Sequence, residues 1–157
     1  MARRRTKSHT RKIAPDAVHG SALVKKFINA MMWDGKRSIA EGLFYEALDR
    51  IKEKTGESGI EFFNKAIENV KPQVEVKSRR VGGVTYQVPV EVYSARKQSL
   101  AIRWLVSAAR SRSGKTFSEK LAGELMDAVN NNGGAIKKKD EVKRMADANR
   151  AFSHYAW

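Results

Sequence analysis

The chain has 157 residues, with 31 lysines and arginines against 17 aspartates and glutamates and a net charge of +14. Self-repulsion on this scale is usually offset by a polyanionic partner, so the charge favours a nucleic-acid-binding protein over a merely soluble basic one. An anionic membrane surface could also attract such a chain. No apolar run reaches the about 20 residues that span a bilayer, and the absence of cysteine excludes disulfides, thiolate nucleophiles and cysteine-based metal sites.

Residues 1–12 form a basic arm with six basic residues and no acidic one. The arm has no apolar periodicity, so we expect it to become ordered only against its partner. It also lacks the apolar stretch of a secretory signal, which predicts a cytoplasmic protein. The length fits one domain over residues 1–157, with the arm at 1–12, a hairpin at about 73–92 and a tail at about 150–157.

Helical periodicity begins at Ser21 and is broken at Asp34-Gly35. Two S-x-x-E capping boxes, one starting at Ser38 and one at Ser58, then predict two further helices. Gly56 is expected to cap the first of them and Pro72 to end the second. The expected inward faces of the three helices are Val24, Phe27, Ile28 and Met31; Ile39, Leu43, Phe44, Ala47, Leu48 and Ile51; and Ile60, Phe63, Ile67 and Val70.

The apolar period changes to two around residues 73–92. Alternating valines lie on both sides of a Gly82-Gly83 pair, which predicts a β-hairpin. Pro89 restricts its strand to an edge, or to a hairpin outside any larger sheet.

Three more helices are predicted after the hairpin. The first runs from Ala95 to Arg110, the second starts at a third capping box formed by Thr116 and Glu119, and the last covers about 135–151. The inward residues are expected to be Leu100, Ala101, Trp104, Leu105 and Ala108; Phe117, Leu121, Leu125 and Val129; and Val142, Met145 and Phe152. The predicted fold is therefore mainly α: a six-helix domain with a protruding two-stranded antiparallel hairpin and a basic N-terminal arm.

Positive charge is segregated along the chain. Residues 38–70 carry seven acidic against four basic residues, a net of −3, whereas the rest of the chain sums to +17. Residues 92–118 hold six basic residues and no acid. Within them Arg96, Arg103 and Arg110 recur every seven residues and share one stripe of a helix. A solvated face usually alternates in sign, so we interpret this stripe as a phosphate-binding one.

Two smaller basic clusters accompany the stripe. Lys36-Arg37 precedes a predicted helix start, where free N–H groups could add to phosphate binding. The hairpin tip carries Arg79-Arg80 before two glycines, which permit close approach to phosphates or base edges; the alternative is a flexible basic turn. Basic residues of the last helix are a weaker signal, because acidic residues interrupt them.

Enzyme signatures are weak. Gly114-Lys115-Thr116 matches the end of a phosphate-binding P-loop, but Ala109 occupies the position of the required first glycine. His9, His19 and His154 share no metal-ligand spacing. We therefore predict no catalytic residue, no metal, no cofactor and no small-molecule substrate.

Several long blocks resemble the bacterial small-subunit ribosomal protein seven family. They span the whole chain and comprise Asp34-Gly35-Lys36, Phe44-Tyr45, Glu68-Asn69-Val70-Lys71-Pro72, Glu75-Val76, Ser78-Arg79-Arg80-Val81-Gly82-Gly83, Tyr86-Gln87-Val88-Pro89, Arg103-Trp104-Leu105, Lys137-Lys138-Lys139, Arg144-Met145-Ala146, Ala148-Asn149-Arg150-Ala151-Phe152, His154-Tyr155 and Trp157.

The resemblance implies binding to the 3′ major domain of 16S ribosomal RNA and initiation of assembly of the subunit head. Contacts with this RNA are expected from Arg3, Arg4, Arg5, Lys7, Arg11, Lys12, Lys25, Lys26, Lys36, Arg37, Lys77, Arg79, Arg80, Arg96, Lys97, Arg103, Arg110 and Lys115. The exit-site tRNA and the mRNA path are expected to face Arg79, Arg80, Val81, Gly82, Gly83, Lys143 and Arg144. Neighbouring proteins of the head and platform are expected to meet the tail at Arg150, His154, Tyr155 and Trp157.

Two other functions stay open from the residues alone. A DNA-binding architectural protein would use the arginine stripe and prefer duplex DNA. An RNA-modifying enzyme or nuclease would show turnover that is lost when a carboxylate is changed.

Overall fold

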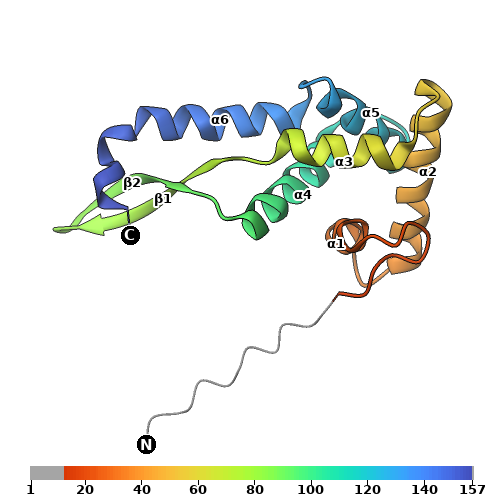
Figure 1. Cartoon of the computed structure of the whole chain (residues 1–157), viewed down its shortest axis with the longest axis horizontal. Coiled ribbons are helices and arrows are strands. Elements are labelled where there is room, and N and C mark those ends of the chain that lie inside the picture. Colours follow the sequence, from red (N-terminus) through yellow and green to blue (C-terminus); the bar gives the residue numbers. More distant parts are fainter. Residues whose placement is uncertain (1–12, 157) are drawn as a thin grey trace, which may run out of the picture.

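The computed structural model describes residues 13–156 and is mostly helical, with one two-stranded antiparallel sheet (Figure 1). This confirms the predicted fold class. Within these residues the elements are α1 (Ala22–Met31), α2 (Arg37–Thr55), α3 (Gly59–Val70), β1 (Val74–Val81), β2 (Val84–Glu91), α4 (Ser94–Ser111), α5 (Phe117–Val129), α6 (Gly134–Ala148) and a 3-10 helix, η1 (Arg150–Tyr155). No helix of the described segment is long and apolar enough to cross a membrane.

The core lies where α2, α3 and α4 pack against α5. Its centre is an aromatic trio from three helices, in which the ring of Phe27 lies 5.6 Å from Phe44 and 5.1 Å from Phe63, while Phe44 and Phe63 are 5.2 Å apart. All three side chains are fully buried. Complete burial of one such side chain stabilises the fold by about 1.5–3 kcal/mol, so this trio fixes how α1, α2 and α3 meet.

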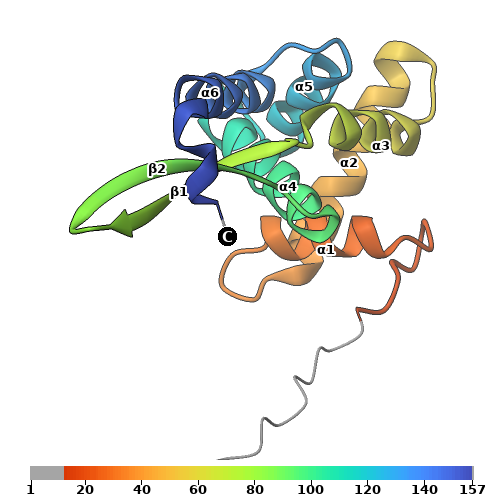
Figure 2. The same ribbon diagram turned by 60° about the vertical axis from the view of Figure 1, so that its left-hand side comes forward.

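The hairpin is closed by the two-residue loop predicted at Gly82-Gly83. Val81 pairs with Val84, and both loop glycines have positive φ values, 57° and 85°. Such a turn matches the right-handed twist of the flanking strands and requires residues that tolerate positive φ. The base of the hairpin lies beside α6, whereas its tip extends beyond the helices (Figures 1 and 2).

The start of α2 differs from the prediction. The helix begins at Arg37, and its N-cap is Lys36, so Ser38 is not the capping residue. The turn before it, with positive φ at Asp34 and Gly35 (52° and 72°), lets the Arg37 N–H bond the Gly35 carbonyl and starts the helix early. The early start does not bury Ile39, which is 58% exposed, so its assignment to the core was wrong.

The other two capping boxes give different outcomes. Thr116 caps α5 as predicted, because its hydroxyl accepts a hydrogen bond from the Glu119 N–H at 3.3 Å. Ser58 is the N-cap residue of α3, but its side chain makes no capping bond; the Glu61 N–H bonds the Ser58 carbonyl instead. The N-cap residue was predicted correctly for both helices, but the predicted side-chain capping bond forms only at Thr116.

The last helix is shorter than predicted. It ends at Ala148, and residues 150–155 continue as the 3-10 helix η1. The side-chain amide of Asn149 donates to the Met145 carbonyl at 2.7 Å, which satisfies an end group of the helix. Met145 is 40% exposed and is not an inward residue, contrary to the prediction.

A buried carboxylate joins α4, α5 and α6. Glu124 is 2% exposed; one of its oxygens accepts from the Ala135 N–H at 2.9 Å, and the other from Arg112 at 3.1 Å. Arg112 also donates to Asp127 at 2.6 Å, and these two acids raise its pKa further above the ordinary value. Because the carboxylate lies at the N-terminus of α6, it also interacts favourably with the helix dipole.

Candidate nucleic-acid interface

A basic groove runs between α1 and α4. Its volume is about 660 Å³, and its charged side chains are all cations: Lys26, Arg103 and Arg110. Lys26 is held in place by a 2.9 Å hydrogen bond to Gln98, across the groove. Ile13, which directly follows the predicted arm, also lines it, together with Ala30, Ala95, Gln98, Ser99, Ile102, Val106 and Ser107. The groove therefore offers concentrated positive charge with apolar walls.

The three arginines of the α4 stripe have different environments, and Arg96 is paired within the protein. Arg96 donates through Nε to both oxygens of Glu75, at 2.8 and 2.7 Å, and so ties α4 to β1. Glu75 is 7% exposed and also pairs with Lys77 at 3.1 Å. The stripe therefore has an acidic partner, contrary to the prediction, and this partner lies outside residues 92–118.

The other two stripe members face the groove. Arg103 is exposed and makes no ion pair or hydrogen bond within residues 13–156. Arg110 donates to the Met31 carbonyl at 3.1 Å and lies over the ring of Trp33, with its guanidinium carbon 5.1 Å from the ring centroid. Arg103 is thus available to an anion, whereas Arg110 is held at the end of α1.

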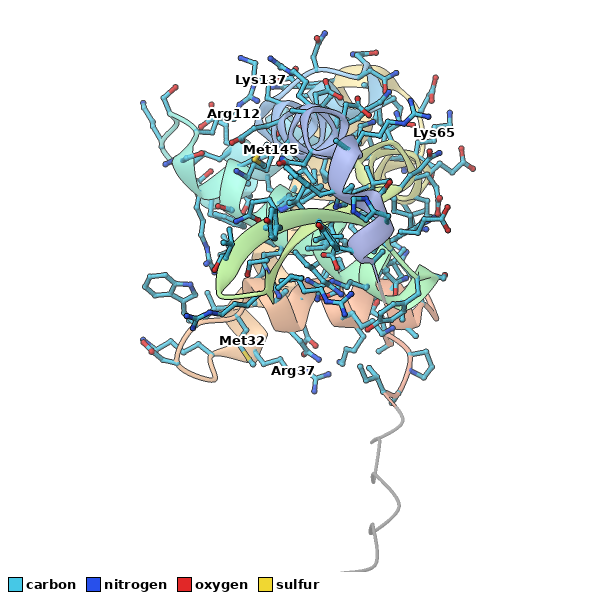
Figure 3. All side chains as sticks on the ribbon, turned by 90° about the vertical axis from the view of Figure 1, so that its left-hand side faces the viewer. Met32, Arg37, Lys65, Arg112, Lys137 and Met145 are labelled. Atoms are coloured by element: carbon cyan, nitrogen blue, oxygen red, sulfur yellow. The ribbon has the colours of Figure 1, made fainter. Side chains whose placement is uncertain are left out.

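Lys25 and Lys26 have opposite environments. Lys25 is 8% exposed and bonds Glu41 at 3.1 Å, so it lies in the protein rather than on the open surface. Glu41 also accepts from Arg37 at 2.8 Å, and half of the Arg37 side chain remains exposed. Arg37 lies at the edge of the molecule near the start of α2 (Figure 3).

The hairpin and the tail contact each other. Arg79 donates a hydrogen bond to the carbonyl of Tyr155, and the ring of Tyr86 lies 5.2 Å from Phe152 and 5.1 Å from Tyr155. Arg80 is exposed and bonds the Gly83 carbonyl at 3.3 Å. The tail residues therefore pack on the hairpin, with Arg150 and His154 left exposed.

The remaining basic candidates lie on the surface. Lys143 and Arg144 of α6 are exposed and, within the part of the chain that the structure describes, form no ion pair. Lys115 is also exposed, and Lys97 is half-buried. Val81 is half-buried at the tip beside the exposed Gly82 and Gly83. Arg3, Arg4, Arg5, Lys7, Arg11, Lys12 and Trp157 lie outside the described residues.

The segment that leads into the groove is anchored by Asp16, a residue that the sequence did not single out. Its carboxylate accepts from the Tyr45 hydroxyl at 2.7 Å and from the N–H groups of Val18 and His19. Burial alone would raise the pKa of Asp16, but these hydrogen bonds outweigh it and hold the pKa below the ordinary 3.8. Burial and the bond to Asp16 raise the pKa of Tyr45 to about 12.

The metal-site and P-loop signatures considered in the sequence can be compared with the described residues. Residues 13–156 contain no group of three or more metal-ligating side chains. Gly114-Lys115-Thr116 follows α4 rather than a buried strand, so the residues cannot form the strand–loop–helix of a P-loop.

A helical body with a basic groove and a basic hairpin is typical of proteins that bind a folded polyanion through charge and shape. The sequence model of ribosomal protein S7p/S5e matches residues 3–150, and the chain belongs to this family. Its members are structural proteins of the ribosome and not enzymes, and the same holds for this chain. The family resemblance inferred from the sequence is thereby confirmed.

Relatives cover almost the full length. Small ribosomal subunit protein uS7 of Nitratiruptor sp. is 59% identical over 98% of this chain and 99% of its own length. The proteins of the same name from Sulfurovum sp. and Brachyspira hyodysenteriae are 58% and 56% identical; the first match covers 98% of this chain and 99% of the relative, and the second covers both chains completely. The predicted ribosomal location in the cytoplasm and the non-enzymatic role agree with these relatives.

Proposed function

We propose that this chain binds the 3′ major domain of the small-subunit ribosomal RNA and initiates assembly of the subunit head. The observation that carries the proposal is the groove between α1 and α4, where Lys26, Arg103 and Arg110 face one space. A-form RNA hides its base edges in a narrow major groove, so recognition through phosphates and shape suits this surface. Neutralising converging phosphates lets RNA helices pack together, which is the scaffolding step of assembly.

The proposed set of RNA contacts is smaller than the set expected from the sequence. Lys25 is excluded because it is buried and bonded to Glu41, and Arg96 because it bonds both oxygens of Glu75. Lys77 and Arg37 contact the same two carboxylates, but their side chains stay 44% and 50% exposed, so both are kept. The remaining set is the arm (Arg3, Arg4, Arg5, Lys7, Arg11 and Lys12), with Lys26, Lys36, Arg37, Lys77, Arg79, Arg80, Lys97, Arg103, Arg110 and Lys115.

The hairpin tip and α6 form the second part of the proposal. Residues 79–83 and the exposed Lys143 and Arg144 would face the exit-site tRNA and the mRNA path. The support is the position of the tip beyond the helices (Figure 2). The tail, with Arg150, His154, Tyr155 and Trp157, would meet a neighbouring protein of the head or platform.

The deciding experiment compares binding to a transcript of the 3′ major domain with binding to unrelated structured RNA and duplex DNA of equal length, across a salt series. We expect a preference of about a thousandfold or more that survives moderate salt. Equal binding to all three, vanishing as salt rises, would contradict the proposal. Preference for the DNA would favour an architectural DNA-binding protein instead.

A matched pair of arginine variants tests the groove. Arg103→Ala should reduce the salt slope of RNA binding by about 0.7–0.9, the value for one lost phosphate contact. Arg96→Ala should leave the slope unchanged, because Arg96 is paired with Glu75. A change of slope for Arg96→Ala but not for Arg103→Ala would place the RNA elsewhere.

Removal of residues 79–83 separates the two parts of the proposal. Docking on the RNA transcript should be largely retained, while retention of tRNA by assembled subunits should weaken. Collapse of docking would make the tip an RNA anchor.

A further inference from the structure

Trp33 is an unusual feature of the surface. It lies in the short loop between α1 and α2, and it is 66% exposed although it is a large aromatic side chain. Met32 and Arg37, on either side of Trp33 in the sequence, both lie at one edge of the molecule (Figure 3). An exposed indole contributes nothing to the core, so its position calls for a different explanation.

The indole is held in a defined orientation. The guanidinium of Arg110 lies over its ring at 5.1 Å, and Arg110 is itself fixed by a 3.1 Å hydrogen bond to the Met31 carbonyl. A guanidinium over an indole is a favourable cation–π contact. Because one partner is tied to the backbone, the ring is preorganised while most of its surface remains accessible to solvent.

A pocket of about 250 Å³ lies next to the indole. Its apolar wall comes from Met31, Ile39, Ala40, Leu43 and Phe117, and the charged side chains that line it are two cations, Lys36 and Arg110. The pocket is smaller than the about 300–1,000 Å³ of sites that enclose whole drug-sized ligands. It therefore suits one planar ring with a negative charge nearby.

Arg110 lines both this pocket and the basic groove between α1 and α4. A strand whose phosphates follow Lys26 and Arg103 in the groove could thus place one base against Trp33 without leaving the cationic surface. Asp34 is the acidic residue of the loop, and it does not line the pocket. The charge arrangement favours an anionic chain with planar bases over an apolar peptide.

We propose that Trp33 and its pocket form a stacking site for one unpaired RNA base, with Arg110 and Lys36 contacting the adjacent phosphates. Sequence-specific recognition of RNA commonly uses unstacked bases that lie on aromatic side chains or on arginine planes. This inference rests on the proposed function, since it requires that the groove hold RNA. It also accounts for the exposure of Ile39, which becomes part of the base pocket rather than a core residue.

The test combines affinity with salt dependence on the 3′ major domain transcript. Trp33→Ala should weaken binding by about 5- to 150-fold, which corresponds to the ~1–3 kcal/mol typical of one base stacked on an aromatic side chain. The salt slope should not change, because stacking releases no counterion. Trp33→Phe should recover part of the affinity, and Lys36→Ala should instead reduce the slope.

A fluorescence measurement locates the base directly. The chain has three tryptophans, so the signal of Trp33 is the difference between the native chain and Trp33→Phe. Adding the transcript should quench that difference signal. Val18→Ala truncates another exposed apolar residue (65% exposed), which lines a different pocket together with Asp49 and Glu57, and it should leave affinity unchanged.

The outcomes distinguish this inference from the proposed function. Suppose that the native chain prefers the transcript, that Trp33→Ala binds the transcript as tightly as the native chain does, and that no quenching occurs. The proposal of a base-stacking site at Trp33 would then be wrong. If the native chain shows no preference among nucleic acids, the proposed function fails first. A loss of affinity accompanied by a changed salt slope would make Trp33 a support for Arg110 and would also overturn the stacking role.

Discussion

The helical bundle and the hairpin extension are stabilised in different ways. The bundle comprises α1 to α5 with the start of α6, and most of its buried apolar side chains form one cluster around the Phe27, Phe44 and Phe63 rings. The extension comprises β1, β2, the end of α6 and η1 (Figure 1). Its buried side chains, such as Val88, Val142 and Ala146, lie outside that cluster.

The extension is stabilised by an ion pair and by contacts between aromatic rings. The Arg96–Glu75 pair holds its base, and the Tyr86, Phe152 and Tyr155 rings hold its middle. Regions with few buried apolar contacts open locally at lower free energy than the global unfolding. The hairpin can therefore adjust to a partner while the bundle keeps its shape.

The largest effect should come from the bundle. Phe63→Ala removes the ring that contacts both Phe27 and Phe44, and truncation of a buried Phe costs about 3–5 kcal/mol of unfolding free energy. Denaturant unfolding of this variant should show a midpoint shift without a separate hairpin transition. Survival of native stability would mean that the trio does not govern the bundle.

The buried carboxylate that links α4 and α5 to the start of α6 should be nearly as sensitive. Arg112→Ala leaves Glu124, which is 2% exposed, without its charged partner. Breaking a buried pair costs about 3–5 kcal/mol, and we expect about 3 because Arg112 is itself 34% exposed and the Ala135 N–H still bonds Glu124. The double change with Glu124→Gln should restore part of the loss, as measured by denaturant unfolding; no restoration would contradict a charge-based cause.

Two glycines of the bundle should respond with opposite signs. A Cβ at Gly59 would lie 2.5 Å from the Leu48 carbonyl oxygen, so Gly59→Ala should cost about 1–3 kcal/mol through overpacking of α2 against α3. Gly42 lies inside α2 with nothing within 4 Å of the added carbon, and Gly42→Ala should stabilise by up to about 1 kcal/mol. Thermal unfolding of the pair measures both, and equal shifts would refute the close approach.

The smallest global effect should come from the extension. Phe152→Ala removes one ring contact with Tyr86 and should lower the unfolding free energy by less than about 1 kcal/mol. Amide hydrogen exchange should nevertheless become faster in β1 and β2 and stay unchanged in α2 and α3. Uniformly faster exchange would show that the extension and the bundle unfold as one unit and are not stabilised separately.

Much of the bundle could be predicted from periodicity. Val24, Phe27, Phe44, Phe63, Ile67 and Leu125 are all buried as expected. The errors lie at helix ends: Ile39 near the start of α2 and Met145 near the end of α6 are exposed. The 3.6-residue period indicates a face, but only the neighbouring elements decide how far along the helix that face is covered.

The sequence predicted which basic residues belong to the candidate interface, but not what each of them contacts. The heptad spacing indicated that Arg96, Arg103 and Arg110 share a side of α4, but it could not show that Glu75 pairs with the first and Trp33 with the last. Trp33 itself had no signal, since it belongs to no apolar period. Only the tertiary structure shows that Trp33 is exposed, and its exposure is what makes it a candidate binding residue.

By itself the sequence determined the basic character of the protein, its helices and hairpin, and its membership of a family, because these follow from composition, periodicity and turn chemistry along the chain. The tertiary structure decided which basic side chains face an open groove and which form ion pairs with carboxylates of the protein. The physical reason is that an ion pair depends on separation in space. Glu75 and Arg96 lie on different elements, with their charged groups 2.7 Å apart, a distance that no spacing along the chain encodes.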